Sequence, residues 1–182
     1  MTDLLSELEV VADPHADLVA RASRWLRSNG CRVILCDPFR ANVQYGEQPD
    51  AIGWRDGLSI LVEVKVSRAD FLRDSKKRFR AVPELGMGDW RFYLTPPGMI
   101  SSDDLPLGWG LLEHDGRSVK RVHGGPKGNV WWSSVPFVGN KRNETAMLVS
   151  ALAQTNRRTP VTRRGMSDYS AWDSAMSQEG EG

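Results

Sequence analysis

The chain has 182 residues, 40% of them hydrophobic and 26% charged, which is typical of one globular domain with a hydrophobic core. Its net charge of +1 excludes a protein held on nucleic acid by a strongly basic overall field. No apolar run approaches the roughly 20 residues of a membrane helix, and the N-terminus lacks the basic flank and apolar core of a signal peptide, so a cytoplasmic protein is expected.

The first third of the chain predicts a helix followed by three strands. Asp13 is a typical N-cap residue and Pro14 a typical first helical residue, and apolar side chains recur at helical spacing as far as Asn29-Gly30. A further short helix is expected in the first dozen residues. The expected strands cover residues 32–36, 51–54 and 58–66. Asp56-Gly57 predicts a tight turn that pairs the last two strands as a hairpin.

The remainder predicts a second helix, three more strands and a final helix. Ser67 and Asp70 form a capping-box pattern that opens a helix expected to run to residue 82. A strand is expected at 91–94, a hairpin at 109–113 and 118–122, and a helix at 143–154. From Thr155 the chain is polar and aperiodic, which predicts a disordered tail over residues 155–182. Residues 1–154 are therefore expected to form one α/β domain with a mixed sheet.

An acid and a base interrupt the apolar strand expected at residues 58–66. Because side chains alternate along a strand, Glu63 and Lys65 should share one face. Pro49-Asp50 begins the preceding strand, and the Asp56-Gly57 turn folds that strand back, so Asp50 could lie next to Glu63. Burying such charges is costly unless each finds a partner. Two converging carboxylates beside an ammonium group would suit a hard divalent cation.

This group of residues predicts a metal-assisted hydrolysis. Asp50, Glu63 and the Val64 carbonyl would hold Mg²⁺ or Mn²⁺, with water and a phosphate oxygen completing the coordination. A metal so held lowers the pKa of a bound water and neutralises charge that builds up on the phosphate. Lys65 would orient that water or stabilise the charge. The expected catalytic residues are therefore Asp50, Glu63 and Lys65.

The helix expected after this strand carries a basic side. From Lys65 to Arg80, seven basic residues stand against two acidic ones, which gives a local charge of +5. On a helical wheel, four of these basic residues lie opposite the apolar side. The residues expected to contact a nucleic-acid backbone are Arg68, Arg73, Lys76, Lys77 and Arg80.

These motifs resemble a known family. Asp50 followed by Glu63-Val64-Lys65 resembles the signature of the PD-(D/E)xK nuclease superfamily, and Pro49 supplies even its proline. The longer string Ile60-Leu61-Val62-Glu63-Val64-Lys65-Val66-Ser67-Arg68-Ala69-Asp70-Phe71, followed by Asp74, Lys76 and the later Tyr93-Leu94-Thr95-Pro96-Pro97-Gly98, is similar to the MmcB-like DNA repair branch and to many uncharacterised bacterial and phage proteins. The similarity spans about Ala16 to Val122, and the long string is far more specific than the short signature.

The resemblance implies both a fold and an activity. The fold would be restriction-endonuclease-like, with a mixed central sheet, an αβββαβ core and flanking helices. The activity would be hydrolysis of DNA phosphodiester bonds by a metal-dependent deoxyribonuclease, in DNA repair or phage–host processes, in a bacterial cell or a phage-infected host. Many members carry another acid on the first helix. Here that helix offers Asp17, with His15 nearby, and Glu47 is the other candidate ligand. Members often form a homodimer, but no heptad or apolar helix face here demands one.

Other interpretations of the same residues stay open. Asp50, Glu63 and Lys65 could form a structural ion pair at a sheet edge, and the basic side could be an ordinary solvated surface. Some members of the superfamily bind nucleic acid without cutting it. A third alternative is a protein-interaction module that reuses the scaffold for an unidentified protein partner.

Overall fold

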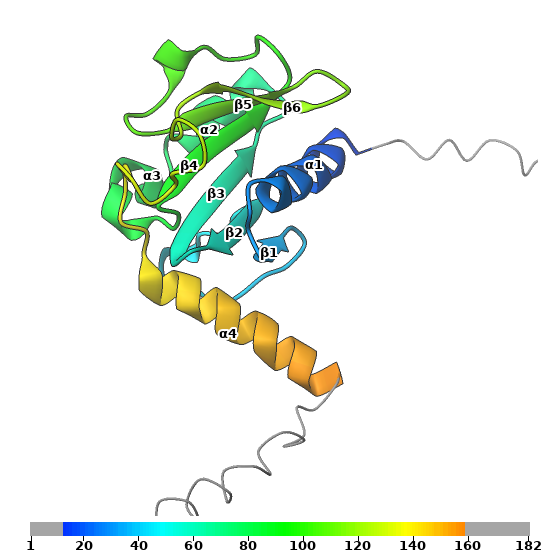
Figure 1. The fold of residues 1–182 in the computed structure, drawn as a ribbon, viewed down its shortest axis with the longest axis vertical. Helices are drawn as coiled ribbons and strands as arrows, with labels where there is room; N and C mark the ends of the chain where they lie inside the picture. Colours follow the sequence, from blue (N-terminus) through cyan, green and yellow to red (C-terminus); the bar gives the residue numbers. More distant parts are fainter. Residues whose placement is uncertain (1–12, 159–182) are drawn as a thin grey trace, which may run out of the picture.

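The computed structural model describes residues 13–158, which form a mixed six-stranded open sheet flanked by helices (Figure 1). The strands stand side by side in chain order, from β1 to β6. Their bounds are β1 Val33–Cys36, β2 Ala51–Arg55, β3 Leu58–Val64, β4 Trp90–Thr95, β5 Gly110–His114 and β6 Val119–His123. β3, β4 and β5 run parallel to one another, whereas the other neighbouring strands are antiparallel. The prediction of an α/β domain with one mixed sheet is confirmed.

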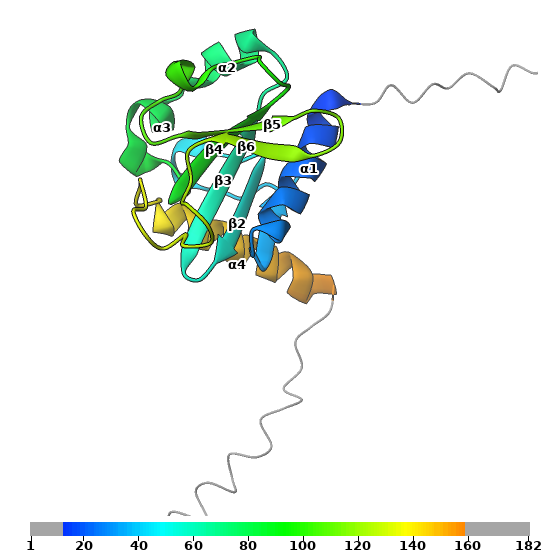
Figure 2. The ribbon, with the colours of Figure 1, turned by 45° about the horizontal axis from the view of Figure 1, so that its top comes forward.

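The helices cover both faces of this sheet. The helices are α1 Pro14–Ser28, α2 Arg68–Asp74, α3 Arg78–Ala81 and α4 Lys141–Arg158, and short 3-10 turns lie at Gln44–Gly46, Pro83–Leu85 and Ser102–Asp104. Helix α1 packs on one face, while α2 and the first part of α4 pack on the other (Figure 2). The far end of α4 projects beyond the sheet (Figure 1).

Strict alternation along β3 divides the hydrophobic core in two. Ile60, Val62 and Val64 point toward α1, where they pack with Trp25 and Leu26. Leu61 points to the opposite face, into a second cluster formed with Ile52 of β2, Tyr93 of β4, Phe71 of α2 and Met147 of α4. Because Glu63 and Lys65 follow Leu61 at two-residue intervals, their side chains enter this second face.

The local signals in the sequence correspond to the observed element ends. Asp13 caps α1, and its Oδ1 accepts the His15 backbone N–H at 2.9 Å. Ser67 caps α2, and its Oγ accepts the Asp70 N–H at 3.2 Å. The turn between β2 and β3 places Asp56 and Gly57 at positive φ, which Gly and Asp tolerate better than most residues. The predictions of the α1 start, the β2–β3 hairpin and the β5–β6 hairpin are therefore confirmed.

The prediction of one continuous helix over residues 67–82 is wrong. Helix α2 ends at Asp74, and α3 begins at Arg78 after an extended Lys77 with ψ of 137°. The Lys76 and Lys77 N–H groups bond to carbonyls three residues earlier, as in a tightened helix end. This break turns Arg80 into the protein, where it meets acidic side chains. On a helical wheel for an unbroken helix, Arg80 falls on the exposed side instead.

The elements predicted at the two ends of the chain are either corrected by the structure or lie outside the described residues. Helix α4 runs to Arg158, so the predicted boundary between domain and tail at Thr155 was placed too early. The short helix expected in the first dozen residues, and the tail from residue 159 on, fall outside the described residues. Within residues 13–158, no helix combines the length and apolar character needed to cross a membrane.

Candidate active site at the end of strand β3

Asp50 and Glu63 face each other across the β2–β3 ribbon. Ala51 is paired with Val62, so the next residues outward, Asp50 and Glu63, are opposite one another and on the same face of the sheet. The Val64 N–H donates to Asp50 Oδ2 at 2.8 Å and holds this carboxylate against β3. The other oxygen, Oδ1, lies 3.4 Å from Nε2 of His15, at the start of α1. The β2–β3 hairpin therefore sets Asp50 opposite Glu63 in the register of the two strands.

Lys65 lies between two buried acids on the same face. Its Nζ is 3.3 Å from Glu63 Oε2 and 3.4 Å from Asp74 Oδ1. Its backbone N–H donates to the Leu94 carbonyl at 3.0 Å, which continues the pairing of β3 with β4 past the end of the strand. The Lys65 side chain is only 5% exposed, so its ammonium depends on these carboxylates to compensate for lost hydration.

Asp74 belongs to this group of residues, although the motif resemblance that includes it assigned it no role in the site. Its Oδ2 accepts from Arg80 Nε at 2.8 Å and from the Tyr93 hydroxyl at 2.9 Å. Its Oδ1 lies 2.6 Å from Nζ of Lys77. Tyr93 is paired with Glu63 across β3 and β4, a register that only the folded sheet reveals. The spacing of Asp74 from Lys65 along the chain gave no signal that the two side chains meet.

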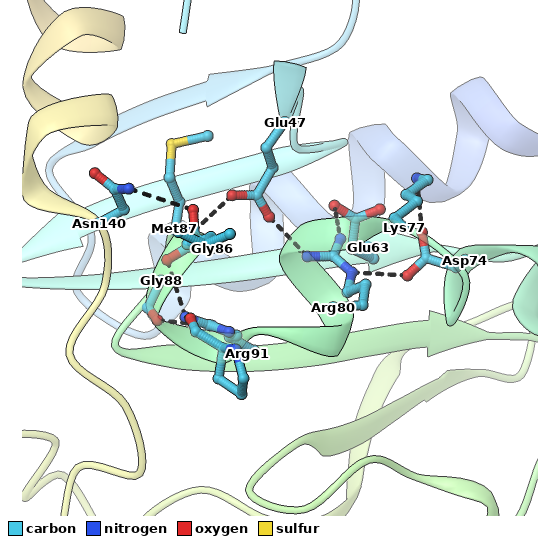
Figure 3. Close-up of polar contacts among 12 residues, drawn as sticks. Glu47, Glu63, Asp74, Lys77, Arg80, Gly86, Met87, Gly88, Arg91 and Asn140 are labelled. Atoms are coloured by element: carbon cyan, nitrogen blue, oxygen red, sulfur yellow. Dashed lines mark hydrogen bonds and ion pairs between the residues drawn. The ribbon is translucent and has the colours of Figure 1, made fainter. Parts of the chain in front are cut away.

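Arg80 is the central cation of the group (Figure 3). Its guanidinium lies 2.7 Å from Glu47, 2.7 Å from Glu63 and 2.8 Å from Asp74. It also lies over the Trp109 ring, 4.8 Å from the ring centroid. The prediction that Arg80 contacts a nucleic-acid backbone is therefore wrong, because its side chain is only 2% exposed and is engaged by three carboxylates.

Glu47, the other candidate metal ligand, lies in the same network of buried charges. It is fully buried; its Oε1 accepts from Arg80 and its Oε2 accepts from the Met87 N–H at 2.6 Å. Both oxygens are therefore engaged by Arg80 and Met87, and Glu47 holds Arg80 in place. Asp17, the acid on α1, is paired with Arg21 at 2.7 Å, and it is His15 of that helix that reaches Asp50.

Burial and neighbouring charges shift the pKa values of the buried acids in opposite directions. Burial, together with the negative charge of Glu63, raises the pKa of Asp50 to about 6. Burial raises the pKa of Glu47 to about 7 in spite of Arg80. Burial would also raise the pKa of Asp74, but Arg80 and Lys65 outweigh it and hold that pKa well below its usual range. Asp50 is thus a carboxylate whose charge the surrounding cations do not fully compensate.

The donors at Asp50 and Glu63 suit a small, hard cation. Mg²⁺ is commonly bound by one or two carboxylates, with water and substrate phosphate completing its octahedron. Asp50 and Glu63 supply two adjacent carboxylates, and the Val64 carbonyl follows directly on β3. The raised pKa of Asp50 means that its negative charge is disfavoured in the folded protein. A bound cation would compensate that charge. Over residues 13–158, no group of three or more His, Cys, Asp or Glu side chains is arranged to hold a metal, so a larger protein cage is not formed.

The basic side chains after β3 do not form one continuous surface. Arg68 forms an ion pair with Asp104 at 2.8 Å, and Arg73 forms one with Asp70 at 3.5 Å. Lys76 is exposed on the turn between α2 and α3. Lys77 is half-exposed and paired with Asp74. The helix break therefore separates Arg68 and Arg73 from Lys76 and Lys77, and it removes Arg80 from the surface altogether.

The comparisons with known proteins bear on the fold alone. No protein-family profile matches the chain, and no curated protein sequence matches it. Its fold is similar to a solved structure described as SPO1766, a protein of unknown function from Silicibacter pomeroyi. That similarity has a TM-score of 0.56 at 22% sequence identity, over 88% of this chain and 99% of the other.

Proposed function

We propose that this protein is a divalent-metal-dependent nuclease that hydrolyses DNA phosphodiester bonds, with Asp50, Glu63 and Lys65 as its catalytic residues. The supporting observation is the register of the β2–β3 hairpin, which sets Asp50 opposite Glu63, with Lys65 on the same face two residues later. The same three residues carry the resemblance to the PD-(D/E)xK signature, which also supports the proposal.

Each residue of the group has a role in this proposal. Asp50, Glu63 and the Val64 carbonyl would hold Mg²⁺ or Mn²⁺, and the bound ion would supply a water of lowered pKa and positive charge beside the phosphate. Lys65 orients the attacking water or stabilises the charge that develops on the phosphate. Arg80 and Asp74 act as positioning residues, because they contact Glu63 and Lys65 and hold both side chains in the site.

The decisive experiment measures cleavage and metal binding in the same protein. The full chain is incubated with plasmid and single-stranded DNA in Mn²⁺, and Mn²⁺ binding is followed separately by calorimetry. Asp50→Asn keeps the shape of the side chain and removes its charge, and should reduce both Mn²⁺ affinity and cleavage by at least about 100-fold. Lys65→Met should reduce cleavage while Mn²⁺ binding persists.

Asp56→Asn provides the matched control. Asp56 lies on the same hairpin, at the turn, and is exposed, with a positive φ that Asn also adopts readily. It should leave both cleavage and Mn²⁺ affinity unchanged. Equal loss in Asp50→Asn and Asp56→Asn, or wild-type protein that neither cuts DNA nor binds Mn²⁺, would contradict the proposal.

One observation favours a second candidate, a module that binds nucleic acid without cutting it. Both oxygens of Glu63 are already engaged, one with Arg80 and the other with Lys65, so the network of charges closes without a metal. In that case DNA binding should survive Asp50→Asn and fail when Lys76 and Lys77 are both replaced by Glu. A protein that binds no DNA even at low salt would leave the protein-interaction function.

A further inference from the structure

A small cavity lies between α1 and the β5–β6 hairpin, on the face of the sheet opposite Asp50 and Glu63. Both ribbon views show α1 beside this hairpin (Figures 1 and 2). The cavity has a volume of about 270 Å³ and lies between Arg21, Arg24 and Ser28 of α1 and His114, Arg117 and Ser118 of the hairpin. It lies at the lower end of the size range of small-molecule sites, so it suits a small group rather than a large ligand.

The lining of this cavity is strongly basic. Three of the residues around it are arginines, and no carboxylate is among them. Arg21 is paired with Asp17, which neutralises one of the three. Arg24 and Arg117 are exposed, and within residues 13–158 neither guanidinium forms an ion pair. Asp115, an acid on the hairpin, is paired with Lys120 at 2.6 Å. The cavity therefore presents two guanidinium groups that form no ion pair within residues 13–158.

His114 adds a hydrogen-bond donor that has no acceptor. Its Nδ1 accepts the Gly116 N–H at 3.1 Å, so in the neutral ring the proton is on Nε2. The His114 residue is 8% exposed, and its Nε2 is enclosed and has no hydrogen-bond partner in the described part of the chain. Buried polar groups of this kind are normally satisfied, so His114, which lines the cavity, keeps one donor unused in the described part of the chain.

We propose that this cavity binds a phosphate group. A tetrahedral oxyanion presents several acceptor oxygens at once, and arginine guanidinium groups bind such oxygens in paired, charge-assisted hydrogen bonds. Arg24 and Arg117 would bind the anion from opposite walls, and Ser118 would donate its hydroxyl, with His114 at the base of the cavity. The site is distinct from the Asp50–Glu63 site and does not depend on the nuclease function.

The test is a phosphate titration of the full chain at constant ionic strength, with chloride as the reference anion. Calorimetry or amide NMR shifts at Arg24, His114 and Arg117 report binding. The Arg24→Ala/Arg117→Ala double variant should weaken phosphate binding by at least about tenfold. Arg27→Ala is the matched control, because Arg27 is exposed on α1 but does not line the cavity. Both variants remove surface side chains only, and circular dichroism checks their folding.

Two oligonucleotides of one sequence distinguish the sources of the phosphate. One carries a 5′-phosphate and the other a 5′-hydroxyl, and both are titrated in EDTA to prevent cleavage. A preference for the phosphorylated strand that is lost in the double variant supports a strand end as the ligand. Binding of inorganic phosphate with no such preference supports a small phosphate compound. The proposal is overturned if neither phosphate probe binds above the chloride reference, or if the double variant binds phosphate as the Arg27→Ala protein does.

Discussion

Strand β3 carries a buried polar cluster at each end, and the two clusters are built on different principles. At its start, the Ser59 cluster consists of Ser59, Asp89, Lys141 and Glu144. At its end, the Glu63 cluster consists of Glu47, Asp50, Glu63, Lys65, Asp74 and Arg80. Ser59 and Glu63 point to the same face of the sheet, so both clusters occupy the side covered by α2 and α4.

The Ser59 cluster satisfies its acids mainly with neutral donors. Asp89 Oδ2 accepts from the Ser59 N–H at 2.8 Å and the Ser59 hydroxyl at 3.0 Å, and Oδ1 accepts from the Gly139 N–H at 2.9 Å. Glu144 Oε1 accepts from the Gly88 N–H at 3.0 Å, and it lies 2.8 Å from the Ser59 hydroxyl, whose single proton it shares with Asp89 Oδ2. Burial would raise the pKa of Asp89, but Lys141 and these backbone donors outweigh it and lower that pKa. These contacts attach the first turn of α4 to the sheet.

The Glu63 cluster satisfies its acids with buried cations instead, and it does so unevenly. Arg80 and Lys65 serve several carboxylates each, whereas Asp50 and Glu47 keep raised pKa values. A cluster of neutral donors is complete in itself, but a cluster of shared charges can exchange one cation for another. This difference favours the end of β3, rather than its start, for the ligand chemistry that we propose.

The largest expected difference between the two clusters is in their contribution to the free energy of unfolding. Replacing Arg80 with Met leaves Glu47, Glu63 and Asp74 buried without their shared cation. Breaking a buried charge pair in this way typically costs about 3–5 kcal/mol of unfolding free energy. Urea unfolding followed by tryptophan fluorescence at pH 7 measures this loss.

Two further variants make the Arg80 result interpretable. Arg73→Met removes an exposed arginine from the same basic segment and should change the unfolding free energy by no more than about 0.5 kcal/mol. Adding Glu47→Gln to Arg80→Met should recover part of the loss, because one uncompensated carboxylate is then neutral. A loss below about 1 kcal/mol in Arg80→Met would show that the three acids do not depend on this cation.

The same contrast explains how much of the site the sequence could predict. Asp13, Ser67 and the Asp56-Gly57 turn act on their own neighbours, so their patterns are readable locally and the predicted elements formed. The meeting of Asp50 with Glu63 follows from one tight hairpin, and it was predictable for that reason.

The rest of the Glu63 cluster depends on contacts between distant segments. Arg80 has the spacing of an exposed helical residue, and only the break after Asp74 turns it inward. Tyr93 reaches Asp74 through a parallel β3–β4 register that no local pattern encodes. In the Ser59 cluster, Glu144 lies 85 residues from Ser59, so the sequence offered no signal that the two side chains bond.

The pH dependence of stability should differ between the two clusters. The folded-state pKa values of Asp50 and Glu47, about 6 and about 7, lie above their ordinary values of 3.8 and 4.5. Between roughly pH 4 and 7 the folded chain therefore binds more protons at these groups than the unfolded chain does. Their contribution makes the unfolding free energy fall as the pH rises through this window. Asp74 acts in the opposite sense but below it, because its pKa is held low.

We expect the loss between pH 5 and pH 7.5 to be on the order of 4 kcal/mol. Urea titrations at the two pH values measure it. Glu47→Gln should remove much of the difference, because the amide cannot take up the proton. Asp89→Asn, made in the Ser59 cluster, should leave the difference in place. A pH dependence that is unchanged in Glu47→Gln would contradict the assignment of this titration to the Glu63 cluster.

The smallest expected effect tests whether the Ser59 cluster is complete without its cation. The Lys141 side chain is 48% exposed, and Asp89 retains the backbone N–H donors of Ser59 and Gly139 when the ammonium is removed. Lys141→Met should therefore lower the unfolding free energy by no more than about 1 kcal/mol, as for other half-exposed ion pairs. Thermal unfolding measures this change, and Lys141→Arg, which keeps the charge, is its control. A loss as large as that of Arg80→Met would mean that Asp89 also depends on a shared charge, and the two ends of β3 would then no longer differ in kind.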